Sequence, residues 1–121
     1  MRSAWGGVTI DSRDPSTLAR FWATLLGTPA RPAGDDRPGW WRIGPLTEGG
    51  PVINFQPVPE AKEGKARLHL DVWVDDLDEA EQRALALGGT STGQREVIAG
   101  RGTILIARDP EGHEFCLISA E

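Results

Sequence analysis

His69, Asp71 and Trp73 are spaced two residues apart in residues 67–76, RLHLDVWVDD. Leucines and valines alternate with them, so the pattern predicts a strand with one apolar face and one face carrying an imidazole, a carboxylate and an indole. An imidazole titrates near neutral pH and is also a common metal ligand. This second face could therefore be a solvated surface, the wall of a binding site or part of a metal site.

The last predicted strand, EFCLIS, carries two more reactive side chains on one face. Glu114 could bind a cationic group or act as a base, although a solvated strand-end role is also open. Cys116 has apolar neighbours, so we interpret it as a small hydrophobe unless His69 lies beside it. His69 and Glu114 are the two candidates for a catalytic role, and no catalytic role is assigned to either.

Length and composition favour one acidic globular domain, residues 1–121. The formal net charge of -5 argues against nucleic-acid binding, which needs a basic face, and weakly favours a neutral or cationic small ligand. Cys116 is the single cysteine, so no internal disulfide is possible and a cytoplasmic location is expected. Asp11 interrupts any apolar signal segment, and no run approaches the roughly 20 apolar residues of a membrane span, so no membrane partner is expected.

Hydrophobic periodicity and turn residues predict two helices and a series of short strands. Asp14 caps the first helix, which ends at Gly27, and Asp76 caps the second. The predicted strands are 6–13, 40–44, 51–58, 67–74, 101–109 and 114–119, while 28–39 is mainly a loop with room for an edge strand and 90–100 is a loop or irregular strand.

The order of these elements is repeated. Gly27 and Gly88 end the two predicted helices, and Gly7 precedes the first by 20 residues as His69 precedes the second by 19. Each half therefore predicts a strand, a helix and further strands, with the helix covering one sheet face and the other face left open. The two halves are module one, residues 1–58, and module two, residues 66–121.

Four segments resemble the vicinal oxygen chelate (VOC) superfamily, particularly its glyoxalase-like and bleomycin-resistance-like members. They are TIDSRDPSTLARFWATLLG, VINFQPVPE, RLHLDVWVDDLDEAEQRALALGG and ARDPEGHEFCLI, which span most of the chain in the expected order. The resemblance implies an α+β fold of two βαβββ modules, whose mixed sheets curl into a cup with helices outside. It also implies a homodimer, with the cup closed within one chain or by exchange of modules between two chains.

Metal-dependent members of this superfamily hold a metal in the cup with about four side chains from the first and last strands of each module. Carried over by position, these ligands fall on Gly7, on Asn54 or Gln56, on His69 and on Cys116. Only His69 matches the family pattern, so we expect no metal cofactor. Zinc, nickel, manganese or iron remains the alternative, with Glu114 or Asp71 as a third ligand.

Tryptophan is unusually frequent, with five residues against no tyrosine. Alternation places Trp73 in the cup together with one of Trp40 and Trp41, while Trp22 belongs to the helix stripe and Trp5 to a rim or dimer interface. Indoles offer flat apolar walls and cation–π faces. His113 follows a turn glycine, and we assign it a turn role.

We expect the cup to bind a small organic ligand, either aromatic or cationic, without a metal. The expected ligand-binding residues are His69, Asp71, Trp73, Trp40, Trp41, Asn54, Gln56, Glu114 and Cys116. The alternative is a metal-dependent VOC enzyme, a glyoxalase-type lyase or isomerase or a dioxygenase, with His69 as a metal ligand. A third possibility, a structural or partner-binding module, would leave the cup without a purpose.

Overall fold

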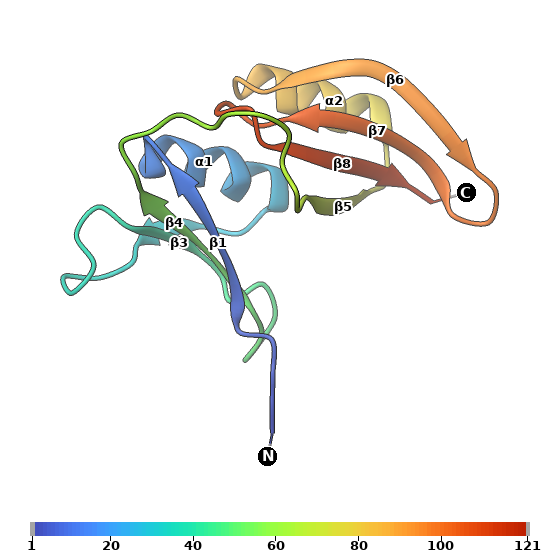
Figure 1. Cartoon of the computed structure of the whole chain (residues 1–121). Coiled ribbons are helices and arrows are strands. Elements are labelled where there is room, and N and C mark those ends of the chain that lie inside the picture. The colour runs from blue at the N-terminus through green and yellow to red at the C-terminus, as the bar shows by residue number, and fades with distance from the viewer. Residues whose placement is uncertain (1, 121) are drawn as a thin grey trace. The chain divides into compact units, whose positions relative to one another are not determined.

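The computed structural model describes residues 2–120 and divides into two compact units, with the division between Ala61 and Lys62. Each unit holds one helix and one four-stranded mixed sheet (Figure 1). The first unit contains β1 (Gly7–Ser12), α1 (Pro15–Leu26), β2 (Ala30–Pro32), β3 (Trp41–Ile43) and β4 (Val52–Pro57). The second contains β5 (Leu70–Val74), α2 (Leu77–Ala86), β6 (Thr90–Ile98), β7 (Gly102–Arg108) and β8 (Glu114–Ser119).

The two sheets have the same topology. Their strand orders are β1-β4-β3-β2 and β5-β8-β7-β6, and in each the first and last strands of the unit pair in parallel. The remaining pairs are antiparallel. The α+β class and the two repeated modules are therefore confirmed.

Helix α1 begins and ends at the predicted residues. The Asp14 carboxylate accepts hydrogen bonds from the backbone N–H and the hydroxyl of Thr17, and Gly27 ends the helix in the left-handed conformation at φ 69°. Its apolar stripe packs on one face of the first sheet. The buried side chains of this core include Leu18, Phe21, Trp22, Ile43, Ile53 and Phe55.

Helix α2 lies against the second sheet in the same way (Figure 1). The Asp76 carboxylate accepts from the N–H of Glu79 at 3.1 Å, so the predicted cap is confirmed. The buried side chains of this second core include Leu77, Ala80, Ala84, Leu105, Phe115 and Leu117. Both sheets thus place alternate residues under a helix and leave the others on an open face.

The structure resolves two alternatives left open by the sequence and corrects one strand prediction. The proline-rich stretch does contain an edge strand, β2, and the stretch after α2 is a strand, β6, with a shift of register between Ser91 and Arg95. The strand expected from residue 67 starts only at Leu70, and Leu68, predicted on its apolar face, is 84% exposed. The residues before Leu70 are held by a side-chain contact described below instead of by strand pairing.

None of the helices within residues 2–120 combines the length and apolar character needed to cross a membrane.

Candidate functional site

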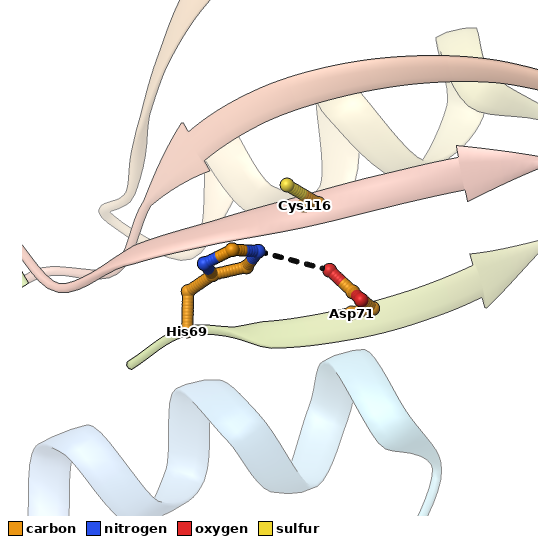
Figure 2. Close-up of side chains that lie close together, drawn as sticks. All are labelled: His69, Asp71 and Cys116. Carbon is orange, nitrogen blue, oxygen red and sulfur yellow. Dashed lines mark ion pairs between the residues drawn. The ribbon is translucent and has the colours of Figure 1, made fainter. Parts of the chain in front are cut away.

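The structure gathers His69, Asp71 and Cys116 on the open face of the second sheet (Figure 2). Strands β5 and β8 are parallel neighbours, and Asp71 is the register partner of Cys116. His69 precedes Asp71 by two residues and points to the same side. One potential ligand atom from each residue lies within 4.8 Å of the other two, and the His69 Nε2 is 3.2 Å from the Asp71 Oδ1. We call these three residues the HDC cluster.

The HDC cluster is open to solvent on one side. The side chains of His69 and Asp71 are 51% and 49% exposed, whereas Cys116 is half-buried. Burial, the negative charge of Asp71 and a hydrogen bond to its carboxylate together raise the pKa of the Cys116 thiol. The thiol of Cys116 thus lies beside both Asp71 and His69, which revises its interpretation as a small hydrophobe.

The surface around the HDC cluster is partly apolar. Trp73 lies two residues along β5 from Asp71 and is 62% exposed. Ile106 is the register partner of Cys116 on β7, and it also lines a pocket of about 410 Å³ formed by residues of β6 and β7. The other residues of this pocket are Thr92, Gln94, Arg95, Glu96 and Ile104. A polar cluster thus adjoins an aromatic wall and a small pocket on one sheet face, a combination typical of ligand sites.

Glu114 does not join the HDC cluster. Its carboxylate accepts from the N–H of Ala66 at 2.6 Å and from the Nζ of Lys62 at 3.0 Å, and its Oε1 lies 3.8 Å from the Nε of Arg108. The hydrogen bond from Ala66, followed by that of Lys62 and its charge, outweighs burial and lowers the pKa of Glu114. A carboxylate held in its charged form is a weak base, so these contacts favour a structural role for the catalytic candidate Glu114, that of fixing residues 62–66.

Replacement of Glu114 by alanine is expected to lower the free energy of unfolding by about 1–3 kcal/mol at pH 7, because the N–H of Ala66 loses its charged acceptor. The pKa of Glu114 is lowered in the folded protein. Its contribution is therefore present above the unfolded value of about 4.3 and is lost as the pH falls through the folded value. Urea unfolding at pH 7 and below pH 4 tests this. The exposed carboxylate of Glu63 supplies the control, and an equal loss in Glu63→Ala would contradict the assignment.

The remaining predicted residues lie in the first unit. On the open face of its sheet, Asn54 accepts a hydrogen bond from the Nε of Arg42 at 2.8 Å, and Gln56 is the register partner of Asp11. Trp40 precedes β3 and alternates onto this face, with the guanidinium of Arg37 4.8 Å from its ring centroid.

Trp41 lies on the opposite, helix-covered face. It is the register partner of the buried Phe55, and the guanidinium of Arg20 from α1 stacks 5.3 Å from its ring centroid. The prediction that Trp41 lines a binding face is therefore wrong, because the pleat turns its side chain toward the helix. The structure thus gathers His69, Asp71 and Cys116, with Trp73 on the same face, and leaves the first-unit residues on another sheet.

Counted back from the helix caps Asp14 and Asp76, Thr9 matches Asp71, and the two sheet registers then fix the positions opposite them. Asn54 pairs with Thr9 as Cys116 pairs with Asp71, so Asn54, and not Gln56, is the equivalent of Cys116. Gly7 is likewise the equivalent of His69, two residues before the paired position. A Cβ atom at Gly7 would lie 2.3 Å from the carbonyl oxygen of Val52, so this position has no room for any side chain.

His113 has the turn role predicted for it. Its Nδ1 is 2.8 Å from the Oδ2 of Asp109, which is buried, and its backbone N–H donates to the same carboxylate. Burial lowers the pKa of His113, but the hydrogen bond and charge of Asp109 outweigh it, and the pKa is raised. His113 therefore stabilises the turn between β7 and β8.

The donors of the HDC cluster fit a divalent metal better than the sequence predicted. An imidazole nitrogen, a carboxylate oxygen and a sulfur suit zinc or a late transition metal, and three protein ligands leave a position for a further group. The four ligands of the family pattern do not fit, because Gly7 has no side chain and the Asn54 carbonyl is bonded to Arg42. The three residues that fit a metal all belong to the second unit. Asp71 would be one of the ligands, although the family pattern places no ligand at its position.

Comparisons with known proteins support these assignments of the fold. The sequence profile described as Glyoxalase-like domain matches residues 7–118. A glyoxalase/bleomycin resistance protein/dioxygenase family enzyme from Burkholderia phytofirmans PsJN superposes with a TM-score of 0.80 at 18% identity, over 98% of this chain and 100% of that chain. A comparison with curated protein sequences gives no match.

The fosfomycin resistance protein FosX from Listeria monocytogenes superposes with a TM-score of 0.77 at 19% identity, over 100% of this chain and 94% of FosX. A mutant of FosX has been solved in complex with Mn(II) and 1S,2S-dihydroxypropylphosphonic acid, and it superposes with a TM-score of 0.76 at 18% identity, over 100% of this chain and 95% of that chain. These likenesses concern the fold. Together with the profile match, they show that the chain belongs to the glyoxalase-like domain family of the VOC superfamily.

Proposed function

We propose that this glyoxalase-like protein binds a small organic molecule, aromatic or cationic, on the open face of its second sheet. The observation that carries the proposal is the HDC cluster beside the exposed indole of Trp73. The carboxylate of Asp71 anchors a positive charge, and the indole supplies a flat wall with an electron-rich face. The pocket reached through Ile106 accommodates an apolar group.

The distribution of charge supports a cationic ligand at this face. Residues 1–61 contain six arginines, no lysine and six acidic residues, so the first unit is formally neutral. Residues 62–121 contain seven basic and twelve acidic residues, so the second unit carries the whole net charge of -5. A field of this sign raises the local concentration of cations around the HDC cluster.

Trp73→Ala is expected to weaken binding of a cationic aromatic probe, benzyltrimethylammonium, by about tenfold, because a cation–π contact contributes roughly 1–2 kcal/mol when partly desolvated. Fluorescence titration with matched calorimetry measures the affinity. Trp5 is 69% exposed and lies on the first unit, so Trp5→Ala is the matched control. Equal affinities of wild type and Trp73→Ala, or the absence of saturable binding to any aromatic or cationic probe, would contradict the proposal.

A second candidate function is that of a metal-dependent VOC enzyme, a lyase, isomerase or dioxygenase. The observation that favours it is the approach of His69, Asp71 and Cys116 to within 4.8 Å. A divalent metal bound there would supply Lewis-acid stabilisation of negative charge on substrate oxygens. Cys116 would first have to lose its proton, and His69 would have to present a neutral nitrogen. Metal analysis of the purified protein separates the two candidates, since stoichiometric, tightly bound metal would contradict the metal-free proposal.

We further propose that the two modules form one domain spanning residues 1–121, and that the protein is a cytoplasmic homodimer. The profile match across both modules supports the single domain, and the resemblance to the superfamily supports the dimer. A single calorimetric unfolding transition is expected for one domain. The mass of a dimer is expected at equilibrium in the ultracentrifuge. Two separate transitions, or a monomer at micromolar concentration, would contradict them.

A further inference from the structure

Two arginines face each other on the open face of the first sheet. Arg31 on β2 is the register partner of Arg42 on β3, and directly opposed residues of an antiparallel pair share one face. The same row continues through Asn54 on β4 to Thr9 on β1. One line of four neighbouring side chains therefore crosses the whole sheet, with two guanidinium groups at one end.

Hydrogen bonds fix both guanidinium groups without neutralising them. Arg42 donates through its Nε to the Oδ1 of Asn54 at 2.8 Å, and Arg31 donates through an Nη to the carbonyl oxygen of Gly44 at 2.5 Å. Both acceptors are uncharged, and neither arginine forms an ion pair with a residue among 2–120. Like charges directly opposed across two strands are destabilising, so this arrangement favours a negatively charged group between them.

An aromatic wall stands beside the pair. Trp40 lies two residues before Arg42 and on the same face, and the guanidinium of Arg37 stacks on its ring. The backbone N–H of Ala33 donates to the carbonyl oxygen of Trp40. The pairing of β2 with β3 therefore extends to Trp40 and fixes its backbone. An anion bound by the arginines would therefore share this sheet face with the indole of Trp40.

We infer that Arg31 and Arg42, with Asn54 and Thr9, form a binding site for the oxyanion group of a small molecule, a carboxylate or a phosphate. Guanidinium groups match both anions because their parallel N–H groups can contact two oxygens at once. The first unit is formally neutral as a whole, so the pair is a local concentration of positive charge and does not reflect an excess of basic residues. The site lies on a different unit from the HDC cluster, so it goes beyond the proposed function and stands or fails separately.

Isothermal titration calorimetry of the full chain with inorganic phosphate, phenyl phosphate and benzoate tests the inference. Saturable binding of phosphate and phenyl phosphate alone assigns the site to phosphates, and binding of benzoate alone assigns it to carboxylates. Tighter binding of phenyl phosphate than of inorganic phosphate is expected, because only the former reaches the Trp40 wall. No saturable binding of any of the three would overturn the inference.

Two variants locate the bound anion. Arg42→Gln is expected to weaken binding at least tenfold, and Asn54→Asp to do the same by placing a carboxylate against Arg42 while both arginines stay in place. Arg2→Gln removes one exposed positive charge from the same unit and is expected to leave the affinity unchanged. Circular dichroism verifies folding of each variant. An equal loss in Arg2→Gln and Arg42→Gln, or full affinity in Asn54→Asp, would overturn the inference.

Discussion

Introducing histidine at Gly7 is expected to destabilise the protein by about 3 kcal/mol and not to complete a metal site. Gly7 is the position equivalent to His69, so Gly7→His would be the obvious way to restore a lost ligand. A Cβ atom there would lie 2.3 Å from the carbonyl oxygen of Val52 and 3.1 Å from its Cγ2. Since Gly7 is the register partner of Val52, strands β1 and β4 would have to separate at this point to make room for any side chain.

Gly6 provides a matched control for this substitution. A Cβ atom at Gly6 would meet no atom within 4 Å, so Gly6→Ala is expected to change the free energy of unfolding by no more than about 0.5 kcal/mol. Urea denaturation of Gly7→His, Gly7→Ala and Gly6→Ala measures the difference. A stable Gly7→His protein that binds zinc more tightly than wild type would show that the first strand can carry a ligand after all.

Asp71→Asn is expected to weaken binding of cations at the HDC cluster, by about tenfold for benzyltrimethylammonium and on the order of 100-fold for Co²⁺. Asp71 carries the negative charge that both His69 and Cys116 contact, and asparagine keeps its shape without the charge. Burial is the main cause of the raised pKa of Cys116 and would remain, but the same change removes the contribution of the Asp71 charge, so a larger fraction of thiolate is expected at a given pH. Cobalt absorption and calorimetry report the affinity, and the rate of alkylation by iodoacetamide reports the thiol.

Asp75 is an exposed carboxylate in the same unit, and Asp75→Asn changes the net charge equally. It is expected to alter neither the cation affinity nor the alkylation rate. If both variants weakened binding to the same extent, the bulk charge of the second unit and not Asp71 would account for the binding. Unchanged alkylation in Asp71→Asn would mean that its carboxylate does not govern the thiol.

Much of the fold could be predicted because its signals are local. The caps at Asp14 and Asp76 and the stop at Gly27 are properties of a few adjacent residues. The repeat then predicted two equivalent modules, and the two sheets do share one topology, although the strand order itself was not predicted. The start of β5 was wrong because Leu68 fits the alternating pattern, whereas a distant carboxylate, Glu114, holds the backbone just before it.

The candidate site was only partly accessible to sequence reasoning. Alternation placed His69 and Asp71 on one face. Their proximity to Cys116 depends on the register of β5 against β8, two strands that are more than 40 residues apart in the chain. Register likewise decides that Trp41 turns toward α1 and that Arg31 faces Arg42. A one-residue shift would reverse each of these statements, and no local pattern fixes it.

We propose that the HDC cluster and the adjoining open face of the second sheet form the site for cationic ligands. Two-dimensional ¹H–¹⁵N NMR of the labelled protein, titrated with benzyltrimethylammonium and separately with Zn²⁺, tests it most directly. Saturable shifts are expected in the amides of β5 and β8 and around Ile106, and these shifts are expected to be lost in Asp71→Asn. Shifts confined to the first unit, or no saturable shifts with either cation, would contradict it.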